Sequence, residues 1–587
     1  MLKLLKDLKK REMLSIFIIF LLVITQVWLE LRMPEYMSQI TRLVQTQGSD
    51  INEVWQKGIY MVSCAFASLF VAIITGYFTS KVSANFSLRL RKKIFTKVED
   101  LSIQEVNSFS TSSLITRSTN DVTQIQMLMA MGIQLVIKSP VMALLAILKI
   151  IDKSWEWSAM TGVAVVILLS LGAVLVSIVV PRFKRVQKLI DKLNGITREN
   201  LNGIRVVRAF NAEEYQENKF EDANSELTGI QLFNQRAFAA MNPVMSFVMY
   251  GLTLFIYYSG AYFISRSTMA GKLTIFSNMI VFSTYAMQVI MSFLMLGMIY
   301  MMYPRAKVSI NRINEVLDQE ISVKSGNMKK DISKEIGTIE FKNVSFKYPD
   351  AEENLLSNIS FKANKGDTIA FIGATGSGKT TLINLIPRLY DATEGEVLVD
   401  GINVKEYSDE ILHNKIGYVP QNTFLFNGSV SYNISFGDNG KGKITDKKIK
   451  EAVKVAQAKE FVEKMDDKYD SIIARGGTNI SGGQKQRLSI ARAIARDPEI
   501  FIFDDSFSAL DYKTDSLLRE ELKKYTKNVT NLIVSQRIGT IMHADTIIVL
   551  DKGKIVGNGK HKDLLDNCPL YKQIALSQLT EEELANA

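Results

Sequence analysis

Six long apolar runs within the first 303 residues constrain the fold of this chain more than any other feature. Each run supplies the roughly 20 residues that a membrane-spanning helix needs, and a soluble domain rarely buries six such segments so close together. The first run follows a basic start, but it is too long for a signal-peptide core and has no small-residue cleavage site. The runs cover residues 13–33, 58–79, 127–150, 157–180, 243–265 and 275–303.

The distribution of lysine and arginine predicts how these spans are oriented. The segment up to Arg11 and the loops 79–126 and 181–240 together hold 22 of these residues, against five in the three alternate loops. Basic loops of membrane proteins stay in the cytoplasm. We therefore expect a multi-pass protein of a cell membrane, with its N-terminus, both long loops and its C-terminal half in the cytoplasm. The net charge of +10 then needs no nucleic acid as partner, because the lipid bilayer explains it.

The same pattern divides the chain into domains. Phe86–Leu101 and Arg182–Ile196, in the two long basic loops, carry helical periodicity, so we expect the membrane helices to continue into the cytosol. The predicted architecture is an all-α six-helix transmembrane domain over 1–310, a polar linker over 311–336 and an α/β domain over 337–587.

A phosphate-binding loop opens the second half. Thr368–Ile372 is an apolar run fit for a buried strand, and GATGSGKT (Gly373–Thr380) and a helical pattern follow it. Strand, glycine loop and helix start are the context that this motif requires. Backbone N–H groups cradle phosphate, Lys379 pairs with the β/γ-phosphates and Thr380 offers its hydroxyl to Mg²⁺. We therefore expect ATP and Mg²⁺ as cofactors, with nucleotide contacts from Gly373, Ala374, Thr375, Gly376, Ser377, Gly378, Lys379, Thr380 and Thr381.

A second apolar strand, IFIFDD, ends in Asp504 and Asp505. Asp504 is the expected Mg²⁺-side carboxylate. A strand ending in aspartate is a weak signal alone, but SGGQ precedes it and SALD follows it, at Ser508–Asp511. Together with the phosphate loop, these motifs resemble the ATPase domain of ABC transporters, from about Ile339 to the C-terminus.

That resemblance implies further roles. Tyr348 would stack on adenine, and Gln421, in the Q-loop, would reach Mg²⁺. Gln536 occupies the switch position. The signature, which would contact a nucleotide held by a partner chain, comprises Ser481, Gly482, Gly483 and Gln484.

Six spans ahead of such a domain resemble an ABC exporter half-transporter, because importers of this superfamily generally keep the two parts on separate chains. The resemblance implies a dimer that sandwiches two ATP molecules between the two ATPase domains. Phe109–Val122 and Leu201–Phe220 look like the regions that hold its coupling helices.

Three positions depart from the family pattern. Asp505 stands where glutamate is usual, Gln536 where histidine is usual, and Arg475 where glutamate is common. Aspartate is one methylene shorter than glutamate, and misplacement by about 1 Å costs roughly 10²-fold in rate; glutamine offers no imidazole. In these positions the chain resembles the degenerate-site subunit of heterodimeric bacterial multidrug ABC exporters. We therefore predict a degenerate ATP site in a heterodimer of a bacterial membrane, whose partner half-transporter carries the catalytic glutamate and the switch histidine. The alternative is a slow homodimer, and Arg475 either tunes communication or is neutral.

The predicted substrate rests on weaker signals. Methionine side chains suit surfaces that accept many shapes, but core or lipid packing explains a methionine stripe equally well. Lys138 lies in the third span, where a charge faces an aqueous cavity or a partner unless the helix extends into the cytosol. We predict efflux of amphipathic drugs; lipid or peptide export and an ATP-gated channel or sensor are the alternatives. The stripe in the sixth span comprises Met287, Met291, Met295, Met298 and Met302.

Overall fold

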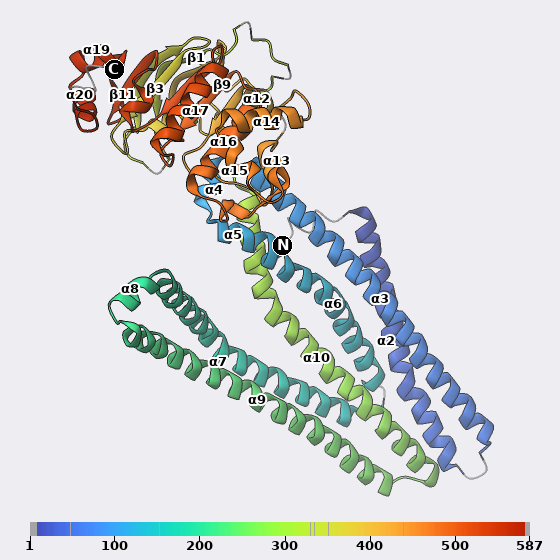
Figure 1. Ribbon diagram of the computed structural model, residues 1–587. Helices are drawn as coiled ribbons and strands as arrows, with labels where there is room; N and C mark the ends of the chain where they lie inside the picture. Colours follow the sequence, from blue (N-terminus) through green and yellow to red (C-terminus); the bar gives the residue numbers. More distant parts are fainter. Residues whose placement is uncertain are drawn as a thin grey trace. The chain divides into compact units, whose positions relative to one another are not determined.

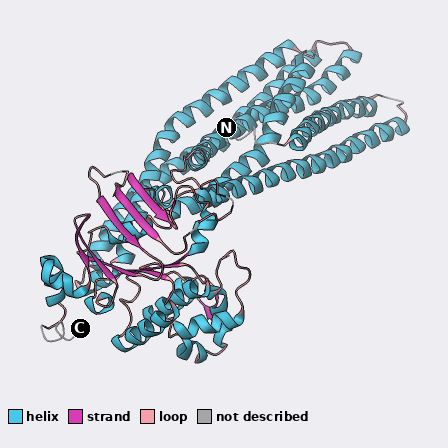
Figure 2. Ribbon diagram, turned by 90° about the horizontal axis from the view of Figure 1, so that it is seen from above, coloured by secondary structure: helices cyan, strands magenta, loops and turns pink. Residues whose placement is uncertain are grey.

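The computed structural model describes residues 9–46, 49–151, 153–328, 330–333, 335–349, 351–437 and 439–580. The chain forms two compact units, and Figure 1 follows both from the blue N-terminal helices to the red C-terminal domain. The first unit is all helical, whereas the second holds every strand of the described residues (Figure 2). The first comprises residues 1–99 and 111–319, and the second 100–110 and 320–587.

Six helices of the first unit are long and apolar enough to cross a membrane, and all six predicted runs lie inside them. The predicted six-span domain is therefore confirmed, and the chain is a multi-pass membrane protein. The 50 residues of α3 extend about 75 Å at 1.5 Å per residue, well beyond the roughly 30 Å hydrocarbon core of a bilayer. These helices are α2 (Lys10–Gln45), α3 (Ile51–Asp100), α6 (Val122–Ile151), α7 (Trp155–Asn202), α9 (Glu213–Ser265) and α10 (Met269–Leu317).

Side chains from α2, α6, α7, α9 and α10 form the core of the first unit. Tyr285 of α10 is fully buried and donates a hydrogen bond to the carbonyl of Leu31 on α2 at 2.8 Å. Trp157 of α7 donates to the Ser259 hydroxyl of α9 at 2.8 Å. The helices α7 and α9 lie side by side, joined through α8 (Ile204–Ala209), as Figure 1 shows.

The sixth span continues past residue 311, where the sequence pattern places the start of the linker. It remains helical to Leu317, because Ile310 and Ile313 are buried against a cluster of α3 and α6 side chains that includes Phe86. Ion pairs fix the same end of the helix. Arg117, in a π-helical turn (Arg117–Asp121), contacts Glu315 at 2.8 Å. The polar linker therefore begins only after α10 ends.

The second unit is an α/β domain, as predicted. Its six-stranded sheet is parallel except at β12, and its four-stranded sheet is antiparallel. A third pair, β7 (Gly428–Ser429) with β8 (Ile472–Ile473), is short. In spatial order, the larger sheet comprises β12 (Lys554–Gly559), β11 (Thr546–Asp551), β3 (Thr368–Gly373), β10 (Thr530–Val534), β9 (Ile500–Asp504) and β6 (Ile416–Val419), and the smaller one β2 (Leu356–Ala363), β1 (Ile339–Phe346), β4 (Glu394–Val399) and β5 (Ile402–Asn403).

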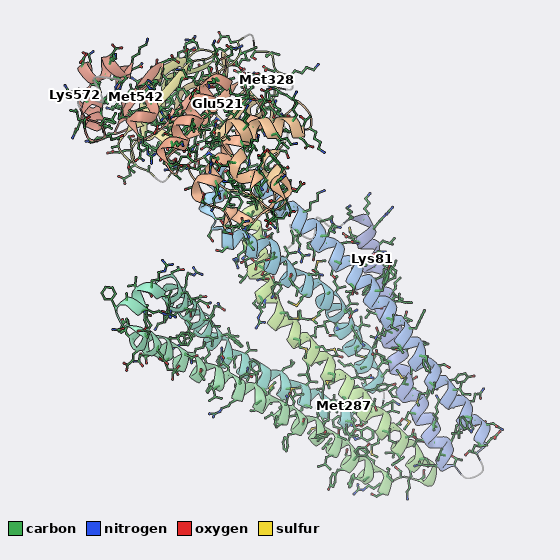
Figure 3. All side chains as sticks on the ribbon, in the orientation of Figure 1. Lys81, Met287, Met328, Glu521, Met542 and Lys572 are labelled. Atoms are coloured by element: carbon green, nitrogen blue, oxygen red, sulfur yellow. The ribbon has the colours of Figure 1, made fainter. Side chains whose placement is uncertain are left out.

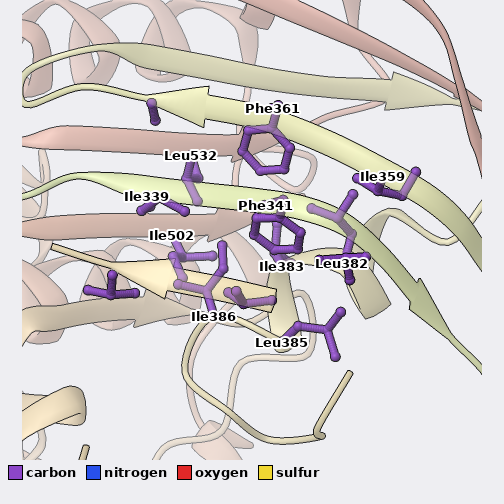
Figure 4. Packing of buried hydrophobic residues seen from close by; sticks show 14 of the residues in the cluster. Ile339, Phe341, Ile359, Phe361, Leu382, Ile383, Leu385, Ile386, Ile502 and Leu532 are labelled. Atoms are coloured by element: carbon purple, nitrogen blue, oxygen red, sulfur yellow. The ribbon is translucent and has the colours of Figure 1, made fainter. Parts of the chain in front are cut away.

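A shared hydrophobic core joins the two larger sheets (Figure 4). The rings of Phe341 and Phe361 stack at 4.6 Å between centroids, and Ile502 and Leu532 pack into the same cluster from the larger sheet. The helices around these sheets are α11 (Lys379–Asn384), α12 (Asp409–Lys415), α13 (Val430–Ile434), α14 (Asp446–Val455), α15 (Lys459–Glu463), α16 (Gly482–Ala495), α17 (Tyr512–Tyr525), α18 (Ile538–Ile541), α19 (His561–Asn567) and α20 (Pro569–Leu576).

The short helix α4 (Ile103–Ser108) belongs to the second unit although it follows a membrane helix in the chain. The Ser102 and Ser322 hydroxyls are hydrogen-bonded at 3.2 Å, and Asn107 hydrogen-bonds Tyr390. Of the region expected to hold a coupling helix, Phe109–Val122, only the first two residues belong to this unit. The segment that packs with the ATPase-like domain thus lies slightly earlier in the chain; α5 (Thr111–Thr116) follows it.

Candidate functional site

Close backbone approach explains the glycines of the phosphate loop. The loop begins where β3 ends, at Gly373, and it ends where α11 starts, at Lys379. A Cβ on Gly373 would lie 2.1 Å from the carbonyl oxygen of Leu550, so no other residue fits there. Gly378 adopts a left-handed φ of 95°, and a Cβ on it would lie 2.6 Å from the Leu356 side chain. The loop is therefore shaped by neighbouring strands as well as by its own residues.

Lys379 directs its ammonium group onto the carbonyls of this loop. Its Nζ donates to the Gly373 carbonyl at 2.9 Å, to the Ala374 carbonyl at 2.8 Å and to the Ser377 hydroxyl at 3.3 Å. Burial lowers the pKa of Lys379, and the negative charges of the two nearby aspartates oppose that shift. The cation thus stands where a phosphate held by the loop would meet it.

Asp504 closes the opposite side of the site. It ends β9, and its Oδ1 accepts a hydrogen bond from the Thr380 hydroxyl at 3.0 Å. Burial raises the pKa of Asp504, and the Asp505 charge adds to this, whereas the Thr380 hydrogen bond opposes it. A hydroxyl and a carboxylate at hydrogen-bond distance, beside a phosphate loop, are the donor set that Mg²⁺ takes together with nucleotide phosphates.

Asp505 is held in position by its backbone. It adopts a left-handed φ of 45°, and its N–H donates to the Val534 carbonyl at 2.9 Å. Burial raises the pKa of Asp505, and the charges of Arg537 and Lys379 and a hydrogen bond with Gln421 oppose the rise.

Most of the predicted nucleotide-site residues line one cavity of about 220 Å³. Leu355 and Val534 also line it; sequence reasoning assigned them no role because both are ordinary apolar residues, although Val534 lies two positions before Gln536. Gly373, Ala374 and Ser377 do not line it. The predicted residues in its wall are Thr375, Gly376, Gly378, Lys379, Thr380, Thr381, Gln421, Asp504, Asp505 and Gln536.

Tyr348 lies beside this cavity without lining it. Its hydroxyl is 3.1 Å from the Thr381 hydroxyl, and its ring packs edge-on against Phe346 and Tyr390 at 4.9 and 5.5 Å. The aromatic ring expected to stack on adenine is thus anchored next to the start of α11.

The segment around Gln536 is clamped from the far C-terminal part of the chain. Gln578 donates from its amide to the Gln536 carbonyl at 2.7 Å and accepts from the Ile538 N–H at 2.9 Å. Arg537 donates to the Ser508 carbonyl at 2.8 Å, which links this segment to the SALD motif. Gln578 lies outside every motif, so no sequence signal identifies it.

The SGGQ residues build a separate surface at the start of α16. Ser481 caps this helix: its hydroxyl accepts from the Gln484 N–H at 3.3 Å, and the Gln484 side chain accepts from the Ser481 N–H at 3.0 Å. Gly483 lies close to the SALD segment, where a Cβ would be 3.1 Å from the Ala509 carbonyl. Ser481 and Gly482 are exposed and do not line this chain's cavity. The capped helix start leaves its first N–H groups available to an anion.

Arg475 is exposed in a short 3-10 turn, Arg475–Gly477. Two bonds of the Asn479 side chain brace this loop: its amide donates to the Ile472 carbonyl and its oxygen accepts from the Ala474 N–H, each at 2.9 Å. The loop is thus rigid at its base, and Arg475 points to solvent within this chain.

The methionine stripe and Lys138 occupy different surroundings. Among the described residues, none of the five methionines belongs to the hydrophobic core of the first unit. Met291 and Met298 are about half exposed and the other three are partly buried; Met287 is labelled on α10 in Figure 3. Lys138, in contrast, donates to Glu30 of α2 at 2.8 Å. The charge of Lys138 is therefore paired with a carboxylate of the same chain.

Comparisons with known proteins agree with this geometry. The family profile described as ABC transporter transmembrane region matches residues 16–293, and the profile described as ABC transporter matches residues 356–508. An uncharacterized ABC transporter ATP-binding protein of Mycobacterium tuberculosis is 38% identical over 530 residues, which cover 90% of each chain. The uncharacterized ABC transporter ATP-binding protein YfiB of Bacillus subtilis is 35% identical, with 96% of each chain covered.

Two further relatives extend the comparison. The ATP-dependent lipid A-core flippase of Pseudomonas syringae is 32% identical, with 88% of this chain and 84% of the flippase covered. The solved structure of a bacterial Atm1-family ABC exporter with ATP bound superposes with a TM-score of 0.79, covering 97% of this chain and 99% of that one. At 22% identity this structure shows a shared fold and nothing finer.

Proposed function

The chain belongs to the ABC transporters, as an exporter half-transporter with fused membrane and ATPase domains, and we propose that it exports amphipathic drugs as the degenerate-site half of a heterodimer. ATP-driven export is the activity of this family, and a half-transporter works as a dimer with another half. The observation that carries the finer proposal is the position of Asp505 and Gln536, which line the same cavity as Lys379 and Asp504.

In this proposal the site binds Mg·ATP normally. Lys379 and the loop N–H groups hold the phosphates, Tyr348 stacks on the base, and Thr380, Gln421 and Asp504 hold Mg²⁺. The hydrogen bond between Thr380 and Asp504 supports this assignment, because it places two oxygen ligands of the kind that Mg²⁺ prefers side by side.

Hydrolysis needs a carboxylate that polarises water against the γ-phosphate. Asp505 is one methylene shorter than glutamate, and the hydrogen bond from its N–H to Val534 keeps the backbone from advancing to compensate. Gln536 has no imidazole to contact the γ-phosphate; the hydrogen bond from Gln578 goes to its backbone carbonyl and fixes the segment without changing the chemistry of its side chain. ATP held by this chain should therefore turn over slowly, while Ser481 and Gly482 complete the site of a partner that has the consensus glutamate and histidine.

The substrate assignment has two candidates. The methionine stripe, which lies outside the packed core of its own unit, supports a surface for varied amphipathic compounds. The relative named as a lipid A-core flippase favours lipid export as the second candidate. Drug-stimulated ATPase in vesicles, with a spectrum that Ala substitutions along the stripe alter, is expected for the first; lipid flipping without drug stimulation would favour the second.

The heterodimer is tested by comparing steady-state ATPase of variants in the complex assembled with its partner. Asp505→Ala should lower hydrolysis only modestly, because this site contributes little turnover. Disruption of Ser481 and Gly482 should nearly abolish it, and so should replacement of the partner's catalytic glutamate by glutamine. Equal losses from Asp505→Ala and from the partner's glutamate change would mean two working sites, and robust turnover by a verified homodimer would remove the need for a partner.

A further inference from the structure

A second cavity lies within the first unit, between α2, α3 and α10, and has a volume of about 410 Å³. This is within the roughly 300–1,000 Å³ that small-molecule sites occupy. Met33 and Met37 of α2 are four residues apart and share one helix face, and Met61 of α3 also lines the cavity. Three flexible, polarizable thioethers form a wall that adapts to apolar ligands of different shapes.

The polar groups of this wall accept hydrogen bonds. Glu30 lines the cavity, with a side chain about one-fifth exposed. Its Oε1 accepts bonds from Lys138 and from Gln26, both at 2.8 Å, whereas no described residue donates to its second oxygen. Gln288 also lines the cavity, and its buried Oε1 accepts no hydrogen bond from the described residues.

The nearest cation and the hydroxyl of this wall are directed elsewhere. Lys138 approaches Glu30 from α6 and does not itself line the cavity. Thr284 does line it, but its hydroxyl donates to the Ile280 carbonyl at 3.1 Å within α10. An anionic ligand would therefore find no cation in the described wall, and its one amide donor, Gln288, shares that wall with the negative charge of Glu30. The buried side-chain oxygen of Gln288, which has no donor among the described residues, shares this wall with a carboxylate on a membrane-spanning helix. This combination favours a ligand that brings its own donor and positive charge.

We propose that this cavity binds organic cations that have an apolar body. The amino or ammonium group of the ligand takes the place of Lys138 as the counter-ion of Glu30 and donates to the Oε1 of Gln288, while the apolar body contacts the three methionines. This inference rests on the drug-export function proposed above and narrows its substrates to cationic amphiphiles.

The test is ethidium binding to the full chain in lipid nanodiscs, followed by ethidium fluorescence, with the uncharged dye Nile red as the comparison. Glu30→Gln removes a charge-assisted contact and should weaken ethidium binding about tenfold or more, with Nile red binding unchanged. Glu35→Gln is the matched control: Glu35 lies on the same helix and pairs with Lys149 at 2.6 Å, but it does not line the cavity. It should leave both dyes unaffected.

Two further variants separate binding from folding. Gln288→Leu strands no charge and should weaken ethidium binding several-fold while sparing Nile red. Lys138→Gln removes the competing counter-ion, so ethidium should bind more tightly. If the Glu30–Lys138 pair were purely structural, both Glu30→Gln and Lys138→Gln would weaken ethidium binding. Equal losses for the two dyes, or weaker ethidium binding in Lys138→Gln, would overturn the proposal.

Transport distinguishes failure of this site from failure of the proposed function. Glu30-dependent ethidium binding without ethidium transport by the assembled heterodimer would refute drug efflux and leave the site standing. Ethidium transport that Glu30→Gln and Gln288→Leu leave unchanged would refute the site and leave efflux standing.

Discussion

Replacement of Lys415 by methionine should destabilise the ATPase domain strongly. Lys415 ends α12 and is almost fully buried, and its ammonium contacts Asp331 at 2.6 Å, Asp400 at 2.8 Å and Glu499 at 3.1 Å. Burial alone would lower the pKa of Lys415, but hydrogen bonds to Asp331 and Asp400 raise it well above its usual range. The lysine is therefore charged, and it is the shared counter-ion of three carboxylates.

The cost follows from the exposure of those carboxylates. Asp331 and Glu499 retain 40% and 30% of their side-chain exposure, so water can solvate them, whereas the Asp400 side chain is 0% exposed. Methionine fills the space of the lysine stem but leaves Asp400 buried without a cation. Removing one partner of a buried ion pair costs about 3–5 kcal/mol. The double variant Lys415→Met/Asp400→Asn strands no charge and should be more stable than Lys415→Met.

The chain offers a domain-specific assay. It has two cysteines, and Cys568 is buried in the ATPase domain whereas Cys64 lies in the first unit. In a Cys64→Ser background, labelling of Cys568 with a thiol reagent during a thermal or urea titration reports unfolding around that residue. Lys464→Met, which breaks an exposed pair with Glu460, is the control and should behave like the parent. If Cys568 of Lys415→Met is labelled at the same temperature or urea concentration as in the control, Lys415 does not stabilise the domain as a counter-ion. The same conclusion follows if the double variant is no more stable than Lys415→Met.

Two other predictions concern the nucleotide site. Gln578→Ala removes two hydrogen bonds, each worth about 0.5–1.5 kcal/mol, so hydrogen exchange at the Ile538 amide should accelerate about tenfold. Gln573→Ala is the control, and equal exchange rates in the two variants would contradict the proposed clamping of the Gln536 segment by Gln578. Burial raises the pKa of Asp504 and Asp505 above the ordinary 3.8, so protonation should weaken Mg²⁺-dependent ATP binding as pH falls, at a pH above 3.8. Asp504→Asn should abolish the Mg²⁺-dependent part of ATP binding and spare binding without Mg²⁺. Mg²⁺-dependent ATP binding that stays constant as the pH falls to 3.8 would refute the role of Asp504 as a Mg²⁺ ligand.

Structural features that depend on residues close together in the sequence were predictable from the sequence alone. Six apolar runs are long enough to span a membrane by composition, and all six are helices in the structure. The predicted order of strand, glycine loop and helix is also the order in the structure, although α11 begins at Lys379, inside the motif and before the predicted helical pattern. The substitutions at Asp505 and Gln536 are also visible in the sequence, although their catalytic consequence stays a prediction.

Features that depend on distant residues needed the folded structure. Lys138 is 108 positions from Glu30 in the chain, and Gln578 is 42 from Gln536. No periodicity signals such pairs, because periodicity records which face of one element is buried and not which side chain meets it. Likewise, α10 extends to Leu317 because α3 and α6 cover the apolar side chains of an otherwise polar segment. The sequence alone thus determined the spans and the phosphate loop, whereas only the packing of separate elements decided the counter-ion of Lys138, the clamp of Gln578 on the segment around Gln536 and the cavity beside Glu30.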